Sequence, residues 1–127
     1  MQKTIWVVDD NEMNLKMAEF ILRKDYRVIL MDSGIECART IKRERPDLIL
    51  LDVQMPLMNG IRTLQNIRNQ KHHQDVPVIF LTAAADKETV ADAGRLHAVD
   101  YVIKPFDPEE LLRRVAKALE DAESKEK

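Results

Sequence analysis

Residues 46–56 read PDLILLDVQMP, and the four apolar residues at their centre, 48–51, decide the fold. The run is too short for a buried helix, and it stops at the charged residue Asp52. A strand that is apolar at every position must be covered on both faces of its sheet. The segment therefore predicts a central strand of a parallel sheet with helices on both sides.

Similar apolar runs recur along the chain, with room for one helix between each pair. They are residues 5–8, 28–31, 78–81 and the shorter run 101–103. The segments between them show helical spacing and helix-start signals, such as the capping box Ser33–Glu36, the candidate cap Asp86 and the pair Asp107-Pro108. Five strands alternating with five helices predict an α/β, flavodoxin-like (βα)5 fold with right-handed crossovers. The strand order 2-1-3-4-5 is adopted from known folds of this class.

The stretch 11–24 is apolar on two sides of a helix. One side carries Leu15, Ala18 and Leu22, and the other carries Met13, Met17, Phe20 and Ile21. Such a helix is either packed deeply or presents a contact surface, and the sequence does not choose between these.

Length and composition exclude several classes of protein. The 127 residues fit one domain, and 45% apolar with 33% charged residues fit a globular one. A net charge of −2 argues against direct nucleic-acid binding. The single cysteine cannot form an internal disulfide, and no apolar stretch is long enough for a signal peptide or membrane span. We therefore expect a cytoplasmic protein without membrane contact.

Polar residues end the apolar runs. Asp9 and Asp10 follow the first, Asp52 the third, Thr82 the fourth and Lys104 the fifth. The carboxyl ends of parallel strands meet at one sheet edge, where ligands bind. Three clustered carboxylates need a cation, and Mg²⁺ suits a site with few carboxylates and several waters. A carboxylate nucleophile, a metal, a lysine and a hydroxyl together describe phosphoryl transfer.

Each of these residues also has a plainer interpretation. The pair Asp9-Asp10 could cap the next helix, and Asp52 could end its strand in a turn. Thr82 could be an ordinary strand residue, and Lys104 a solvated charge. The joint pattern favours a site, because the groups required for one chemistry fall at the ends of different strands.

The same residues resemble the receiver domain of two-component response regulators. The matching segments are VVDDN (7–11), PDLILLDVQMP (46–56), MNG (58–60), LTA (81–83) and DYVIKPF (100–106). The resemblance extends over about residues 4–120. It implies a receiver domain over residues 1–122, followed by a charged tail, 123–127, that frays or begins a linker.

The resemblance implies a role for each residue of the acidic cluster. Asp52 is the expected phosphoacceptor in a Mg²⁺-dependent reaction. Asp9, Asp10 and Asp52 are expected to bind Mg²⁺ together with the backbone carbonyl of Gln54.

It also implies how a phosphoryl group would be sensed. Thr82 and Lys104 are expected to contact the phosphoryl oxygens, and Thr82 and Tyr101 to act as switch residues. Pro105 resembles the family proline that follows an often cis bond, which would aim Lys104 inward. His97 stands where the family usually has glycine, so we expect a strained or rearranged backbone there.

The expected function is a phosphorelay switch rather than an enzyme: the chain would accept the phosphoryl group and assist its own phosphorylation and dephosphorylation. The added charge would change the surface of the fourth helix (about 87–93), the fifth strand (101–103) and the fifth helix (from 108). The expected donor is a sensor histidine kinase or a histidine phosphotransfer protein. The output would be a downstream protein, a fused effector domain or a phosphorylation-dependent dimer.

Three other functions fit these residues less well. A haloacid dehalogenase-type phosphatase needs an acid two residues after its nucleophile, where this chain has Gln54. A flavin-binding module needs a Ser/Thr/Gly-rich loop after the first strand, where residues 9–12 are DDNE. A receiver that only docks, without being phosphorylated, has no need of the chemical residues that are all present here.

Overall fold

The structure, a computed structural model, describes residues 2–70, 73, 75–83 and 87–125. The elements in order are β1 (Thr4–Val8), α1 (Glu12–Leu22), β2 (Arg27–Met31), α2 (Gly34–Thr40), β3 (Leu48–Asp52), α3 (Gly60–Arg68), β4 (Val78–Thr82), α4 (Lys87–Arg95), β5 (Asp100–Ile103) and α5 (Pro108–Lys125). The strands form one parallel sheet in the order β2-β1-β3-β4-β5. The predicted fold class and strand order are confirmed.

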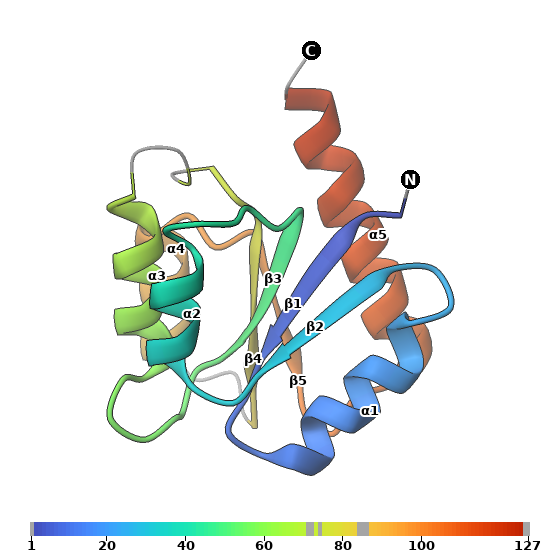
Figure 1. Cartoon of the computed structure of the whole chain (residues 1–127), viewed down its shortest axis with the longest axis horizontal. Helices are drawn as coiled ribbons and strands as arrows, with labels where there is room; N and C mark the ends of the chain where they lie inside the picture. Colours follow the sequence, from blue (N-terminus) through green and yellow to red (C-terminus); the bar gives the residue numbers. More distant parts are fainter. Residues whose placement is uncertain (1, 71–72, 74, 84–86, 126–127) are drawn as a thin grey trace.

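Helices cover both faces of this sheet, α1 and α5 on one side and α2, α3 and α4 on the other (Figure 1). Every residue of β3 and β4 is buried, as their uninterrupted apolar runs predicted. Because successive side chains of a strand point to opposite faces, β3 serves two cores. Leu48 and Leu50 join the core beneath α1 and α5, whereas Ile49 and Leu51 join the core beneath α2 and α3.

Side-chain caps start several helices directly beside the carboxyl ends of the strands. Ser33 Oγ accepts a hydrogen bond of 3.1 Å from the backbone N–H of Glu36, as the capping box predicted. Asn11 and Asn59 cap α1 and α3 in the same way. Asp86, the candidate cap of α4, lies outside the described residues.

The C-terminal helix is longer than expected. α5 continues to Lys125, so residues 123–125 are helical where fraying was expected, and the rest of the tail lies outside the described residues. Its last turns extend past the sheet near the N-terminus (Figure 1). The domain boundary after residue 122 remains a prediction. None of the described helices combines the length and apolar character needed to cross a bilayer.

Candidate functional site

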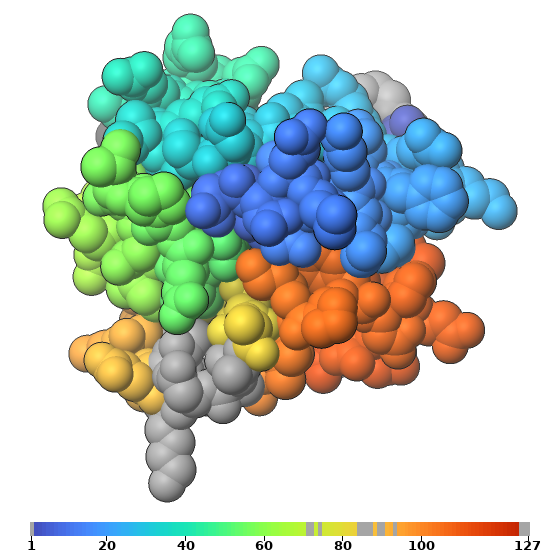
Figure 2. Space-filling model, turned by 90° about the horizontal axis from the view of Figure 1, so that it is seen from below, coloured from blue at the N-terminus to red at the C-terminus, as the bar shows by residue number. Residues whose placement is uncertain are grey.

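The carboxyl ends of β1, β3, β4 and β5 meet at one edge of the sheet. In Figure 2, which looks onto this edge, the segments after β1 (blue), β3 (green), β4 (yellow) and β5 (orange) converge. The hollow there is lined by Asp9, Asp10, Asn11, Asn14, Asp52, Gln54, Thr82, Ala83 and Lys104. The structure therefore brings together the five side chains that the strand ends predicted, with Gln54 beside them.

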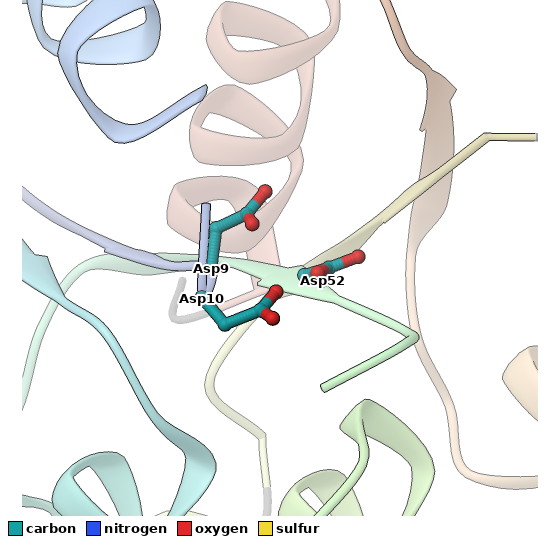
Figure 3. Close-up of side chains that lie close together, drawn as sticks. All are labelled: Asp9, Asp10 and Asp52. Carbon is teal, nitrogen blue, oxygen red and sulfur yellow. The ribbon is translucent and has the colours of Figure 1, made fainter. Parts of the chain in front are cut away.

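The acidic cluster is the most compact part of this hollow. One carboxylate oxygen from each of Asp9, Asp10 and Asp52 lies within 4.8 Å of the others. Figure 3 shows the three side chains gathered where β1 and β3 end. Asp9 is fully buried, Asp52 nearly so, and Asp10 is exposed at the rim. The backbone N–H of Asn11 donates to Asp9 Oδ1 at 2.9 Å, which fixes the direction of that carboxylate.

Lys104 is the cation of the site. Its Nζ donates to Asp52 Oδ1 at 3.1 Å and to Asp9 Oδ2 at 3.3 Å. The bond between Lys104 and Pro105 is cis, in agreement with the family pattern. One ammonium facing three carboxylates leaves the cluster with an excess of negative charge when all three are ionised.

The electrostatics of Asp52 reflect this excess. Burial raises the pKa of Asp52 to about 6, and the charge of Asp9 acts in the same direction. The hydrogen bond and charge of Lys104, and the backbone N–H of Gln54, oppose the rise. Burial alone would lower the pKa of Lys104, but the hydrogen bonds and charges of Asp52 and Asp9 outweigh it and raise that pKa. The lysine therefore stays charged, and a further cation at the cluster would offset the repulsion between its carboxylates.

The donor set fits a hard divalent cation. Mg²⁺ is bound through one or a few carboxylate oxygens and keeps several waters. The cluster supplies three carboxylates, and the exposed position of Asp10 leaves its side open to water. Gln54 lines the same hollow, and its backbone carbonyl as a further ligand stays a prediction.

Asp52 is held by the tight return of the chain after β3. The backbone N–H of Gln54 donates to Asp52 Oδ1 at 3.3 Å, and the N–H of Gly60 donates to the carbonyl of Val53 at 2.8 Å. A Cβ atom on Gly60 would lie 2.3 Å from the carbonyl oxygen of Asp52. The sequence analysis includes Gly60 only in the matching segment 58–60, so its packing role beside the phosphoacceptor candidate was missed.

Two asparagines of the hollow were also missed. Asn11 is the N-cap of α1 and Asn14 lies in its first turn, so both closely follow Asp10 in the chain. That adjacency was the available signal, because the first turn of a helix following Asp10 must border the site.

Tyr101 stands apart from the hollow. It lies in β5, half-buried against the core beneath α2 and α3, and it pairs in register with Phe80 of β4. Thr82, at the end of β4, is nearly buried. The two expected switch residues thus occupy neighbouring strands.

Comparison with protein families decides the class of this site. Residues 5–116 match the family model described as the response regulator receiver domain. The chain belongs to this family. The receiver interpretation is therefore confirmed: the chain is a receiver domain of the two-component type.

Individual relatives agree with this assignment. The chain is 49% identical over 88 residues to the probable C4-dicarboxylate response regulator DctR of Bacillus subtilis, over 69% of this chain and 36% of that protein. It is 37% identical over 124 residues to the alkaline phosphatase synthesis transcriptional regulatory protein PhoP of the same species, over 97% and 51% of the two chains. The chain thus spans only part of the length of these curated relatives.

One of the similar solved structures is a receiver domain with a bound metal ion. It belongs to the sensor histidine kinase PA1611 of Pseudomonas aeruginosa and holds a magnesium ion in its active-site cleft. Its sequence is 34% identical, with a TM-score of 0.86 over 94% of this chain and 98% of that one.

Proposed function

We propose that Asp52 accepts a phosphoryl group from a phosphohistidine of a sensor histidine kinase or a histidine phosphotransfer protein. The observation that carries this proposal is the position of Asp52: its carboxylate lies 3.1 Å from the ammonium of Lys104 and shares a hollow with Asp9 and Asp10. A carboxylate oxygen of Asp52 would attack phosphorus while the bond from phosphorus to the imidazole nitrogen breaks. The product is an acyl phosphate on Asp52 and a free histidine on the donor.

The surrounding residues have separate tasks in this reaction. Asp9, Asp10, Asp52 and the carbonyl of Gln54 would hold Mg²⁺, which supplies positive charge for the phosphoryl oxygens. Lys104 is already aimed at Asp52 and would pair with a phosphoryl oxygen once the carboxylate is phosphorylated. The hydroxyl of Thr82 lines the same hollow and would donate to another oxygen.

The chain would act as a switch and not as an enzyme with a separate substrate. The position two residues after Asp52, where an aspartyl-phosphate phosphatase carries its general acid, is occupied by Gln54. We propose that the chain assists its own phosphorylation and dephosphorylation through Lys104 and the bound cation. The cytoplasmic location predicted above remains part of this proposal.

The proposed output surface is formed by α4, β5 and α5. The backbone N–H of Lys104 donates to the carbonyl of Thr82 at 2.8 Å, so a movement of Thr82 reaches β5 directly. Val99 and Ile103 expose apolar side chains beside and within this edge strand. A downstream protein, a fused effector domain or a second copy of this chain would bind there after phosphorylation.

The proposed donor surface is the exposed side of α1. Leu15, Ala18 and Leu22 are buried, whereas Met13 and Phe20 are 73% and 71% exposed, so the helix is not packed deeply on both sides. The same helix borders the hollow through Asn14. Substitutions Met13→Lys and Phe20→Lys should slow phosphotransfer from a histidine kinase found by profiling at least about tenfold, as expected for exposed apolar contact residues. Labelling by acetyl phosphate should not change.

A direct test uses Mg²⁺ and acetyl phosphate as the small phosphodonor. Wild-type protein should gain one phosphoryl group, stable in acid and labile in base, and the gain should disappear when EDTA removes Mg²⁺. The Asp52→Asn variant should stay unlabelled while its circular dichroism spectrum remains that of the wild type. Equal labelling of wild type and Asp52→Asn would refute the assignment of Asp52. A wild type that no donor labels would support the docking-only receiver instead.

A further inference from the structure

Arg68, the last residue of α3, joins three segments at the amino edge of the sheet, the end remote from Asp52. Its Nε donates to the carbonyl of Leu96 at 3.0 Å, and its Nη2 donates to the carbonyl of His97 at 3.0 Å. Its Nη1 donates to the carbonyl of Val76 at 2.7 Å and, more weakly, to that of His73 at 3.4 Å. One guanidinium therefore connects α3 to the segment that enters β4 and to the end of α4.

Two of these carbonyls belong to the C-terminal end of a helix, where backbone acceptors lack partners within the helix. Leu96 and His97 follow α4 directly, and His97 has a φ of 60°, which turns the chain out of the helix. Glycine usually occupies such a position, and the departure expected from the sequence is thus explained. A cation at this end of a helix also interacts favourably with the helix dipole.

In α4 the structure describes the burial of Glu88, Ala91, Asp92, Gly94 and Arg95. Of the α4 side chains that the structure describes, none is buried. A Cβ atom added to Gly94 would meet nothing within 4 Å. Leu96 and Ala98, which follow the helix, pack against the core beneath α2 and α3. The contacts described at the C-terminal end of α4 are thus the packing of Leu96 and Ala98 and the hydrogen bonds from Arg68.

The two ends of α4 thus connect to different parts of the molecule. The segment before α4 leads from Thr82 and the hollow, and the segment after it is held by Arg68. The planar fork of a guanidinium can serve several carbonyls at once, whereas a lysine ammonium cannot reproduce that geometry. The set of hydrogen bonds that Arg68 donates to these carbonyls therefore requires an arginine.

We propose that Arg68 is a positioning residue that fixes the C-terminal end of α4 and the start of β5 to α3. A displacement that begins at Thr82 would then turn α4 about this fixed end and would not shift the whole helix. The fixed end is a property of the unphosphorylated protein, and only the turning of α4 rests on the proposed function.

The fixed end is tested by backbone ¹⁵N relaxation of the full chain in three variants. Arg68→Met removes the guanidinium and its N–H donors, whereas Arg68→Lys keeps the positive charge. Arg62→Met changes an exposed arginine of the same helix and is the matched control. In Arg68→Met, order parameters for residues 94–99 should fall from about 0.85 toward 0.6, while those of β1 and β3 stay unchanged. In Arg68→Lys the order parameters of residues 94–99 should lie between those of Arg68→Met and the wild type. In Arg62→Met they should equal those of the wild type.

The turning of α4 is tested by adding beryllofluoride with Mg²⁺ as a phosphoryl analogue. In the wild type and in Arg62→Met, amide shifts should change near Thr82 and at the start of α4 but not at residues 96–98. In Arg68→Met the changes should spread to residues 96–98.

Two results would overturn the proposal. One is unchanged relaxation of residues 94–99 in Arg68→Met, even with a lower melting temperature, because Arg68 would then only add stability. The other is an Arg68→Lys variant identical to the wild type, because the fork would then be unnecessary. A wild type that does not respond to beryllofluoride would count against the proposed function, while the relaxation data would still decide whether Arg68 fixes the end of α4.

Discussion

At the amino edge of the sheet, Arg45 pairs with Asp75 at 3.2 Å, with side chains that are 42% and 78% exposed. At the carboxyl edge, Lys104 pairs with Asp9 and Asp52 at similar distances, but these side chains are only 17%, 0% and 5% exposed. Both edges carry a hollow lined by acidic and basic residues. The two edges differ in the burial of their charged side chains. They also differ in the balance of charge, since the carboxyl edge holds three carboxylates around one ammonium.

The comparison shows that charged residues in a hollow do not by themselves indicate chemistry. An exposed ion pair is screened by water and contributes about 0–1 kcal/mol. Buried charges that are only partly compensated are costly, and they are typical of sites where a ligand or a reaction restores the balance. The largest effects of mutation on function should therefore fall at the carboxyl edge.

The sharpest test of this difference is Lys104→Met. Loss of the ammonium removes the positive charge that faces Asp52, so the rate of phosphorylation by acetyl phosphate should fall about 10²–10³-fold. The rate is measured by intact-mass spectrometry over time with saturating Mg²⁺.

The matched control is Arg45→Met, which removes a cation from the amino edge. Its phosphorylation rate should equal that of the wild type, because the pair with Asp75 is exposed and remote from the hollow. Equal rates in Lys104→Met and Arg45→Met would mean that burial of the ion pair at the carboxyl edge has no catalytic consequence.

Two glycines extend the comparison from charge to packing. Gly60→Ala would force a Cβ against the carbonyl of Asp52, so we expect a loss of about 1–3 kcal/mol in unfolding free energy. Gly94→Ala meets open space near the other end of the molecule and should gain about 0.5 kcal/mol from helix propensity. Urea unfolding measures both changes. If Gly60→Ala left the unfolding free energy unchanged, the loop after β3 would be able to move away from the added Cβ atom without loss of stability.

Much of this site could be predicted from the sequence because parallel sheets obey simple geometry. Uninterrupted apolar runs identify buried strands, and the residues that end them must lie at one edge. Asp9, Asp52 and Lys104 followed from that rule before any contact was known. The family resemblance then supplied roles that geometry alone does not, such as the switch residues Thr82 and Tyr101.

The features that were missed depend on contacts between distant parts of the chain. The close approach of Gly60 to Asp52 depends on the path of a loop, and the side of α1 that stays exposed depends on where α5 packs. The partners of Arg68 are backbone carbonyls, which every residue carries, so no sequence pattern marks them. Helix formation at 123–125 was missed because a charged composition indicates solvent exposure and not the absence of a helix.

The smallest effect that we predict concerns the cation itself. Mg²⁺ that binds only the folded protein should stabilise it by about 1.4 kcal/mol at ten times its Kd, a rise of roughly 5 °C in melting temperature. In Asp10→Asn this rise should largely disappear, because one of the three carboxylates within 4.8 Å is lost. Without Mg²⁺ the same variant should melt at or slightly above the wild-type temperature, since repulsion within the cluster is weaker.

Asp47→Asn is the matched control for this measurement. It exchanges a carboxylate for an amide at the amino edge, where Asp47 Oδ2 accepts a hydrogen bond of 2.7 Å from the backbone N–H of Thr4. An amide oxygen can still accept that bond, so the response to Mg²⁺ should match the wild type. If Asp10→Asn keeps the full Mg²⁺ response, the cation binds elsewhere, and the excess negative charge at the carboxyl edge needs another explanation. If Asp10→Asn loses the Mg²⁺ response and Asp47→Asn keeps it, the cation binds at the carboxyl edge, where the excess negative charge and the buried carboxylates lie.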